Sequence, residues 1–259
     1  MNELQALLLG IIQGLTEFLP ISSSGHLEMG HALLGIHGEN NLLFVLVVHV
    51  ATVLSTLVVF RKDIAVLCKD LFQFKWNEST QYIAKLFLSA VPIAIVGLLF
   101  KKQIESLFTG NLLFVGLMLL VTAGLLTLTS FVKKSDGKIT YKNAFIIGLA
   151  QTLAILPGIS RSGSTIATGL LLKGKKEDIA RFSFLMVLLP ILGALVYDVT
   201  KEGVTLEVTE IKNLLIGFFA AFVSGLLACS WMIKIVKRGK LIYFAIYCAL
   251  IGVIAIFAA

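Results

Sequence analysis

Long apolar runs alternate with short polar segments along the chain, and six of the runs are long enough to cross a membrane as helices. They cover residues 41–60, 83–100, 112–132, 182–199, 214–235 and 241–257. Each has roughly 18–22 residues, which matches the apolar core of a bilayer at the rise of an α-helix. The pattern therefore predicts an all-α integral membrane protein with six transmembrane helices.

Two further apolar stretches, 4–36 and 144–172, are too long for one span and are interrupted near the middle. The first is interrupted by PISSSG at 20–25 and the second by PGISRSG at 157–163. Proline and glycine stop a helix at these points. We expect two re-entrant helix–loop–helix hairpins, because irregular backbone at membrane depth is tolerated only inside protein or beside a watery cavity.

The two hairpins resemble each other, and each is followed by three spans. Gln13 precedes the first interruption as Gln151 precedes the second. Since a hairpin returns to its starting side and three spans do not, the two halves would enter the membrane from opposite sides. The chain is thus predicted to be a single membrane domain, 1–259. Its inverted-topology repeats cover about 1–132 and about 140–259, and the hairpins meet near the midplane.

Composition and charge agree with this topology. The 259 residues are 58% hydrophobic and 14% charged, with a mean hydropathy of +0.95, whereas soluble domains are about 25% charged. With the N-terminus outside, 17 of the 22 Lys and Arg fall in inner segments and four in outer ones, as the positive-inside rule requires. Both termini are therefore predicted outside. Basic residues clustered between spans argue against nucleic acid as a partner, and three isolated cysteines argue against zinc or disulfides.

One charged residue, Arg161, falls inside an apolar stretch, where a charge is costly and usually functional. Glycines on both sides free the backbone to turn its N–H groups inward, and the neighbouring hydroxyls add donors. A guanidinium suits phosphate oxygens, and the following helix N-terminus also favours an anion. The candidate phosphate ligands are Arg161, Gly158, Ser160, Ser162, Gly163 and Thr165. The alternative is a structural arginine paired with an acid.

The first hairpin offers an acid and an amide on one helix face, Glu17 and Gln13. Their oxygens could share a hard cation, Mg²⁺ or Ca²⁺, or Glu17 could serve as general base. The alternative is an ion pair between Glu17 and Arg161 across the repeat interface.

His26 directly follows the hydroxyl-rich turn of Ser22, Ser23 and Ser24. It could act as general acid or base, or activate a serine; the alternative is a structural histidine. His49, within the first span, is interpreted as a packing residue. Together the two hairpins would hold a diphosphate beside a lipid tail and hydrolyse a phosphoester or phosphoanhydride.

At these residues the sequence resembles the undecaprenyl-diphosphate phosphatase family of bacteria, the bacitracin-resistance type. The resemblance rests on QGLTEFLPISSSGH at 13–26 and LPGISRSGST at 156–165. It implies hydrolysis of undecaprenyl diphosphate to undecaprenyl phosphate and inorganic phosphate, which recycles the carrier lipid for cell-wall (peptidoglycan) synthesis and gives bacitracin resistance. It also implies a divalent cation, no organic cofactor, the bacterial cytoplasmic membrane, and an active site open to the outer face.

The resemblance further implies essential roles for Glu17, His26 and Arg161, with support from Gln13, Ser22, Ser23, Ser160 and Thr165. Ser23 would be the candidate nucleophile, with an activated water as the alternative. Because Gln13 stands where the family also has Glu, Glu17 is the only carboxylate of its pair.

The rival function is a lipid flippase or transporter, because inverted repeats with broken helices are typical of transporters. The cluster of hydroxyl, imidazole, carboxylate and guanidinium groups favours an enzyme. Small residues four apart, at Gly217, Ala221 and Gly225, permit close helix contact either within the monomer or in a homodimer.

Overall fold

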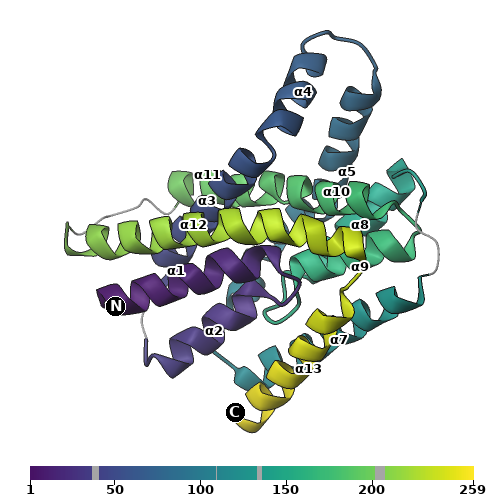
Figure 1. Ribbon diagram of the computed structural model, residues 1–259. Helices are drawn as coiled ribbons and strands as arrows, with labels where there is room; N and C mark the ends of the chain where they lie inside the picture. The colour runs from purple at the N-terminus through teal and green to yellow at the C-terminus, as the bar shows by residue number, and fades with distance from the viewer. Residues whose placement is uncertain (37–40, 109, 133–135, 202–207) are drawn as a thin grey trace.

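The computed structural model describes residues 1–36, 41–108, 110–132, 136–201 and 208–259, and the regular secondary structure in them is helical (Figure 1). An isolated bridge between Gly137 and Gly174 is the one β-type pairing among these residues. The helices are α1 (Glu3–Phe18), α2 (Ser23–Leu33), α3 (Asn41–Val59), α4 (Arg61–Leu71), α5 (Glu78–Leu99), α6 (Lys101–Glu105), α7 (Leu112–Leu128), α8 (Tyr141–Leu153), α9 (Arg161–Leu171), α10 (Lys176–Met186), α11 (Leu188–Lys201), α12 (Val208–Arg238) and α13 (Ile242–Phe257), with a short 3₁₀ turn, Thr129–Phe131, after α7. The all-α prediction is confirmed.

Four helical segments are long and apolar enough to cross a membrane: Glu78–Leu99, Leu112–Phe131, Lys176–Tyr197 and Ile211–Arg238. A fifth would be α3 with α4, two helices that meet at a bend of 76°. The last predicted span corresponds to α13, an apolar helix of only 16 residues. The described helices therefore indicate a multi-pass membrane protein with four or five full-length spans, fewer than the predicted six.

Both predicted interruptions are real helix breaks. The first separates α1 from α2, and the second separates α8 from α9. Each following helix begins at a serine cap, because the Gly25 amide donates to Ser22 Oγ (3.2 Å) and the Gly163 amide donates to Ser160 Oγ (3.0 Å). Capping satisfies backbone donors that would otherwise be orphaned inside an apolar protein.

The helix that carries the first break, α1, lies against the long helix α12 (Figure 1). A Cβ atom on Gly14 would overlap Ser224 Oγ and approach the Gly225 amide nitrogen to 2.8 Å. The small residues of α12 thus pack against α1 inside the monomer.

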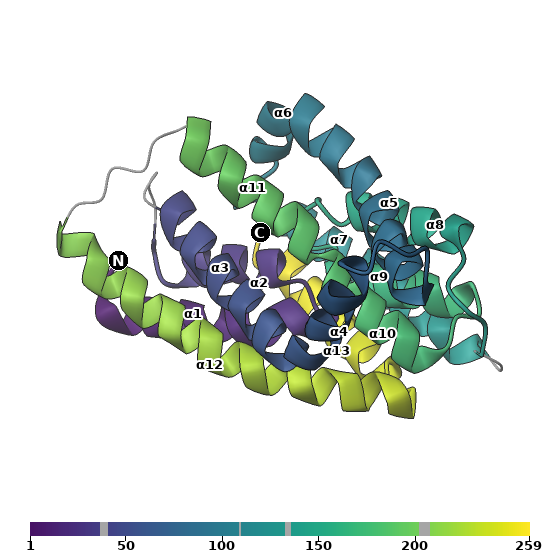
Figure 2. The ribbon, with the colours of Figure 1, turned by 90° about the horizontal axis from the view of Figure 1, so that it is seen from above.

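The helix that carries the second break, α8, is packed against α5 in the same manner, and Figure 2 shows the two side by side. A Cβ atom on Gly148 would lie 2.9 Å from Ser89 Cα. Each broken stretch is therefore held by one long helix, at a distance that only glycine allows.

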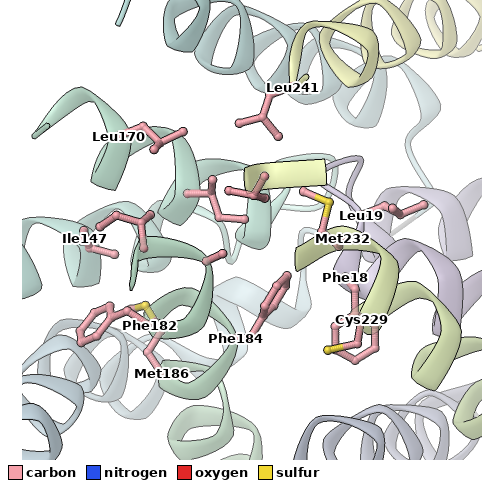
Figure 3. Packing of buried hydrophobic residues seen from close by; sticks show 14 of the residues in the cluster. Phe18, Leu19, Ile147, Leu170, Phe182, Phe184, Met186, Cys229, Met232 and Leu241 are labelled. Carbon is pink, nitrogen blue, oxygen red and sulfur yellow. The ribbon is translucent and has the colours of Figure 1, made fainter. Parts of the chain in front are cut away.

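The hydrophobic core lies directly beside the first break. Figure 3 shows Phe18 of α1 next to Phe184 of α10, with Met232 of α12 above them. The rings of Phe18 and Phe184 meet edge to face, with centroids 5.8 Å apart. Since Phe18 follows Glu17 in the chain, this packing fixes the position of the carboxylate.

Candidate active site

The two helix breaks lie in direct contact. Ser162 Oγ donates to the Leu19 carbonyl oxygen (3.0 Å). A Cβ atom on Gly163 would lie 3.3 Å from Pro20 Cβ, and one on Gly25 would lie 3.2 Å from Gly158 Cα. The chemistry-bearing residues of the two hairpins, more than 130 positions apart in the sequence, are thus brought together as expected.

A buried carboxylate, that of Glu17, lies at the centre of this contact. Its Oε1 accepts a hydrogen bond from Arg161 Nη2 in an ion pair. Its Oε2 accepts from Ser23 Oγ (2.7 Å) and from Gln13 Nε2 (3.0 Å). The ion pair between Arg161 and Glu17, which the sequence left open as a structural alternative, is therefore present. The same carboxylate also accepts a hydrogen bond from a serine hydroxyl.

Two polar atoms at the same place have no hydrogen-bond partner among the described residues. They are Arg161 Nη1 and Gln13 Oε1, both buried. An unsatisfied buried polar atom costs free energy, and more if the group is charged. These two atoms can receive a ligand, since Nη1 is a donor suited to a phosphate oxygen and Oε1 is an acceptor suited to a cation.

Two helix N-termini point into the site. α2 begins at Ser23 and α9 begins at Arg161. Neither helix has an acidic residue in its first turn, so the partial positive charge of both N-termini is left for a ligand. Ser22, just before α2, has a left-handed backbone (φ 69°), a strain that is common at binding sites. Gly158, before α9, has φ 98°, which glycine adopts without strain.

The other hydroxyl groups predicted to bind phosphate, at and after the break between α8 and α9, form hydrogen bonds within the protein. Ser160 caps α9, and its Oγ lies 3.3 Å from that of Ser162. Thr165 Oγ1 donates to the Arg161 carbonyl oxygen (2.8 Å) and lies 2.6 Å from Ser183 Oγ. In this state they hold the backbone of the turn in place. On the first turn, Ser24 Oγ lies 3.3 Å from Ser22 Oγ.

His26 is held at both ring nitrogens. Nδ1 lies 2.8 Å from the Ser22 carbonyl oxygen, and Nε2 lies 2.8 Å from the Tyr247 hydroxyl oxygen. A carbonyl only accepts, so Nδ1 carries the proton, and Nε2 of the neutral ring accepts from Tyr247. The hydroxyl of Ser23 donates to Glu17 instead, so its base in this geometry is the carboxylate.

Four residues at or around the site were not assigned to it from the sequence. His49, interpreted as a packing residue, has its Nε2 3.8 Å from Glu17 Oε2. Tyr247 contacts His26, and Ser183 contacts Thr165. Thr122 Oγ1 accepts from the Ser160 amide (3.0 Å) and donates to the Gly158 carbonyl oxygen (3.1 Å). All four lie on helices outside the two motifs, and only the polarity of His49, Thr122 and Ser183 inside apolar runs could have indicated them.

Replacing Tyr247 by phenylalanine is expected to lower turnover by about 2- to 10-fold, the usual worth of one hydrogen bond. The ring that stacks on His26 is kept and only the hydroxyl is lost. The effect should fall on kcat rather than KM, and it should vanish in a His26→Ala background, because the contact acts through the imidazole.

The matched control for this change is Tyr243→Phe, one turn earlier on α13 and 63% exposed. It should leave turnover unchanged. Equal losses in the two variants, or a full additional loss on top of His26→Ala, would contradict a positioning role for Tyr247.

The protein side chains alone offer little to a metal ion. No group of three or more His, Cys, Asp and Glu that could hold one occurs in the described ranges. Glu17 and the unpartnered Oε1 of Gln13 are the available oxygen ligands. Mg²⁺ is often bound by one or two carboxylates together with substrate phosphates. The residues therefore fit a cation that is completed by phosphate oxygens and do not fit a preformed metal cage.

The sequence is similar to a family of known proteins along almost its whole length. A family model described as "Bacitracin resistance protein BacA" matches residues 6–254. A protein of Bacteroides fragilis named undecaprenyl-diphosphatase is 55% identical over 261 residues, 99% of this chain and 98% of that protein. Proteins with the same name from Christiangramia forsetii and Methanobrevibacter smithii are 54% and 36% identical, over 99% and 98% of this chain and 98% and 96% of their own length.

Proposed function

Because the chain belongs to the family of the bacitracin resistance protein BacA, we propose that it is a membrane phosphatase that converts undecaprenyl diphosphate to undecaprenyl phosphate and inorganic phosphate. The main structural support for this function is the contact of Glu17 with both Arg161 and Ser23, which lie at the N-termini of α9 and α2. The reaction recycles the carrier lipid for cell-wall synthesis. Removal of the diphosphate form, which bacitracin binds, accounts for resistance.

The proposed chemistry follows from Arg161 Nη1, which is unpaired among the described residues, and from the hydrogen bond between Ser23 and Glu17. Arg161 Nη1 and the amides that begin α2 and α9 hold the diphosphate, and the stabilisation of its charge is the main catalytic effect. Glu17 takes the proton of Ser23 as Oγ attacks the terminal phosphorus, and the bond to undecaprenyl phosphate breaks. The departing undecaprenyl phosphate takes the proton from Glu17, which is then again a carboxylate and acts as general base while water hydrolyses the phosphoserine to inorganic phosphate and returns a proton to Ser23 Oγ. Direct attack by water on the substrate is the alternative.

Two further groups support this chemistry. His26, three residues after Ser23 on α2, is proposed to act as an acid–base group through Nε2, the nitrogen that contacts Tyr247 in this state. A divalent cation, bound to Glu17, Gln13 and the diphosphate, would neutralise phosphate charge.

The fine topology is also part of the proposal. The α1–α12 and α8–α5 pairs are equivalent contacts of the two halves, which supports one membrane domain of inverted repeats, 1–132 and 140–259, with re-entrant hairpins. The distribution of the basic residues supports a topology with both termini outside, and the active site is proposed to open to the outer face. Six spans require the 16-residue helix α13 to cross. A homodimer stays a prediction.

The transporter alternative receives no support from the relatives described above, which are named for a diphosphatase. The serine–carboxylate contact at 2.7 Å favours chemistry as well, since translocation needs no activated hydroxyl.

Purified protein in detergent is expected to release phosphate from undecaprenyl diphosphate when Mg²⁺ or Ca²⁺ is present. Chelation with EDTA should stop the release, and adding the cation back should restore it. Ser23→Ala should remove the activity while the folded yield persists, because the proposed attacking oxygen is gone. Ser130→Ala, a change of an exposed serine in the 3₁₀ turn after α7, is the matched control.

Phosphate release that is insensitive to EDTA would overturn the cation part of the proposal alone. No release by well-folded parent protein at any cation concentration would overturn the function. Normal turnover in Ser23→Ala would assign the attack to water.

A further inference from the structure

The hairpin between α4 and α5 projects from the rest of the molecule (Figure 1). α4 leaves α3 at a bend of 76°. The turn after α4, residues 72–77, is followed directly by α5, a helix that begins at Glu78 and is long and apolar enough to cross a membrane. If α5 crosses, this turn lies at the membrane surface.

Three large aromatic side chains point outward from this turn. Phe72 is 75% exposed, Phe74 is 92% exposed and Trp76 is 68% exposed. Phe74 has a left-handed backbone (φ 53°), which is strained for a bulky residue. Exposure of this apolar area to water is unfavourable, whereas aromatic rings are stabilised at the interface between lipid and water.

The two ammonium groups beside these rings have no ion-pair partner in the part of the chain that the structure describes, whereas the acids nearby each have a partner. Asp63 pairs with Arg181 (2.7 Å), the Asp70 carboxylate accepts from the Ser79 hydroxyl (2.5 Å), and Glu78 Oε1 lies 3.8 Å from Lys138 Nζ. Lys69 and Lys75 are exposed and form no ion pair with any residue in the described ranges. The exposed surface of the turn therefore carries three aromatic rings and two ammonium groups that are free to meet an anion.

We propose that this turn, defined by Lys69, Phe72, Phe74, Lys75 and Trp76 and called the aromatic tip, binds anionic lipid headgroups. The rings enter the interfacial layer, and the two ammonium groups meet phosphate groups of the lipid. Positive charge complements an anionic surface, whereas two copies of the same basic surface repel each other. This interaction is independent of the proposed phosphatase activity, because α4 and the start of α5 project away from α1 and α2, which carry the first helix break (Figure 1).

Tryptophan fluorescence tests the proposal, because the chain has only two tryptophans. In a Trp231→Phe variant, Trp76 is the sole reporter. The protein is reconstituted into vesicles of phosphatidylcholine alone or mixed with phosphatidylglycerol. With phosphatidylglycerol, Trp76 emission is expected to shift to shorter wavelength, with stronger quenching by brominated lipid and weaker quenching by acrylamide.

Lys69→Gln with Lys75→Gln should abolish the difference between the two lipid mixtures. The matched control is Lys234→Gln with Lys240→Gln, two exposed lysines near the end of α12, which should preserve the difference. Phosphate release in detergent should be the same for all of these variants, which separates this test from that of the function.

Two results would overturn the proposal. Emission at long wavelength with free acrylamide quenching in both mixtures would place the tip in water. Protection in both mixtures that disappears when the protein is diluted in the vesicles would assign the tip to a contact between copies of the chain.

Discussion

Replacing Arg161 by lysine is expected to lower phosphate release by about 1,000-fold or more, the usual effect of losing an arginine that stabilises a transferring phosphoryl group. The guanidinium uses Nη2 for Glu17 and keeps Nη1 buried and without a partner among the described residues. Lysine has a single nitrogen on a flexible chain and cannot hold both partners in a fixed geometry. Its positive charge still neutralises Glu17, so the folded yield should persist. Turnover of undecaprenyl diphosphate by the detergent-purified variant measures the effect.

The matched control is Arg181→Lys. Arg181 also pairs with an acid, since its Nη2 lies 2.7 Å from Asp63 Oδ1, and it belongs to α10, the helix after α9. This change should retain most of the activity, because Arg181 does not contact the catalytic residues. Near-normal turnover in a folded Arg161→Lys variant would show that the second guanidinium nitrogen is dispensable and that Arg161 has only the structural role.

The second large effect is expected at Gly14, where alanine should destabilise the protein by about 1–3 kcal/mol or more, as overpacking of a tight contact does. The added methyl group overlaps Ser224 Oγ and also meets the backbone of α12 at Ala221 and Gly225. Ser224→Ala removes only the first of these contacts, so it should rescue the Gly14→Ala variant only in part.

The thermal stability of the protein can be measured with its buried thiols. Cys229 and Cys248 are buried, whereas Cys68 is exposed and is replaced by serine. A thiol-reactive fluorophore then reports the temperature at which the two buried thiols become accessible. That temperature should fall in Gly14→Ala. Gly124→Ala on α7 is the control, because a Cβ atom there meets nothing within 4 Å, and alanine favours the helix. Similar transitions in the two variants would mean that α1 and α12 can separate slightly without penalty.

The local features of the site could be predicted from the sequence because they depend on neighbouring residues. Proline and glycine at Pro20 and Gly158 determine where the helices break, and Ser22 and Ser160 supply the caps. The similarity of the two hairpins was enough to predict that Glu17 and Arg161 meet, although 144 positions separate them.

Contacts from other helices could not be predicted in this way. Nothing in the apolar helix α13 distinguishes Tyr247, which contacts His26, from Tyr243, which is exposed. His49 looks like any polar residue within a span until the packing of α3 places it near Glu17. The bend between α3 and α4 also escaped prediction, because no proline or glycine occurs where the helix turns at Phe60.

The packing of α1 on α12 has a consequence for the order of events during synthesis. The first hairpin leaves the ribosome long before its partner helix and before Arg161, which neutralises Glu17. Until most of the chain has been made, the growing protein must keep an unpaired carboxylate and a glycine-lined helix face out of lipid. We therefore expect the site to be completed late in synthesis, after α9 and α12 have been made.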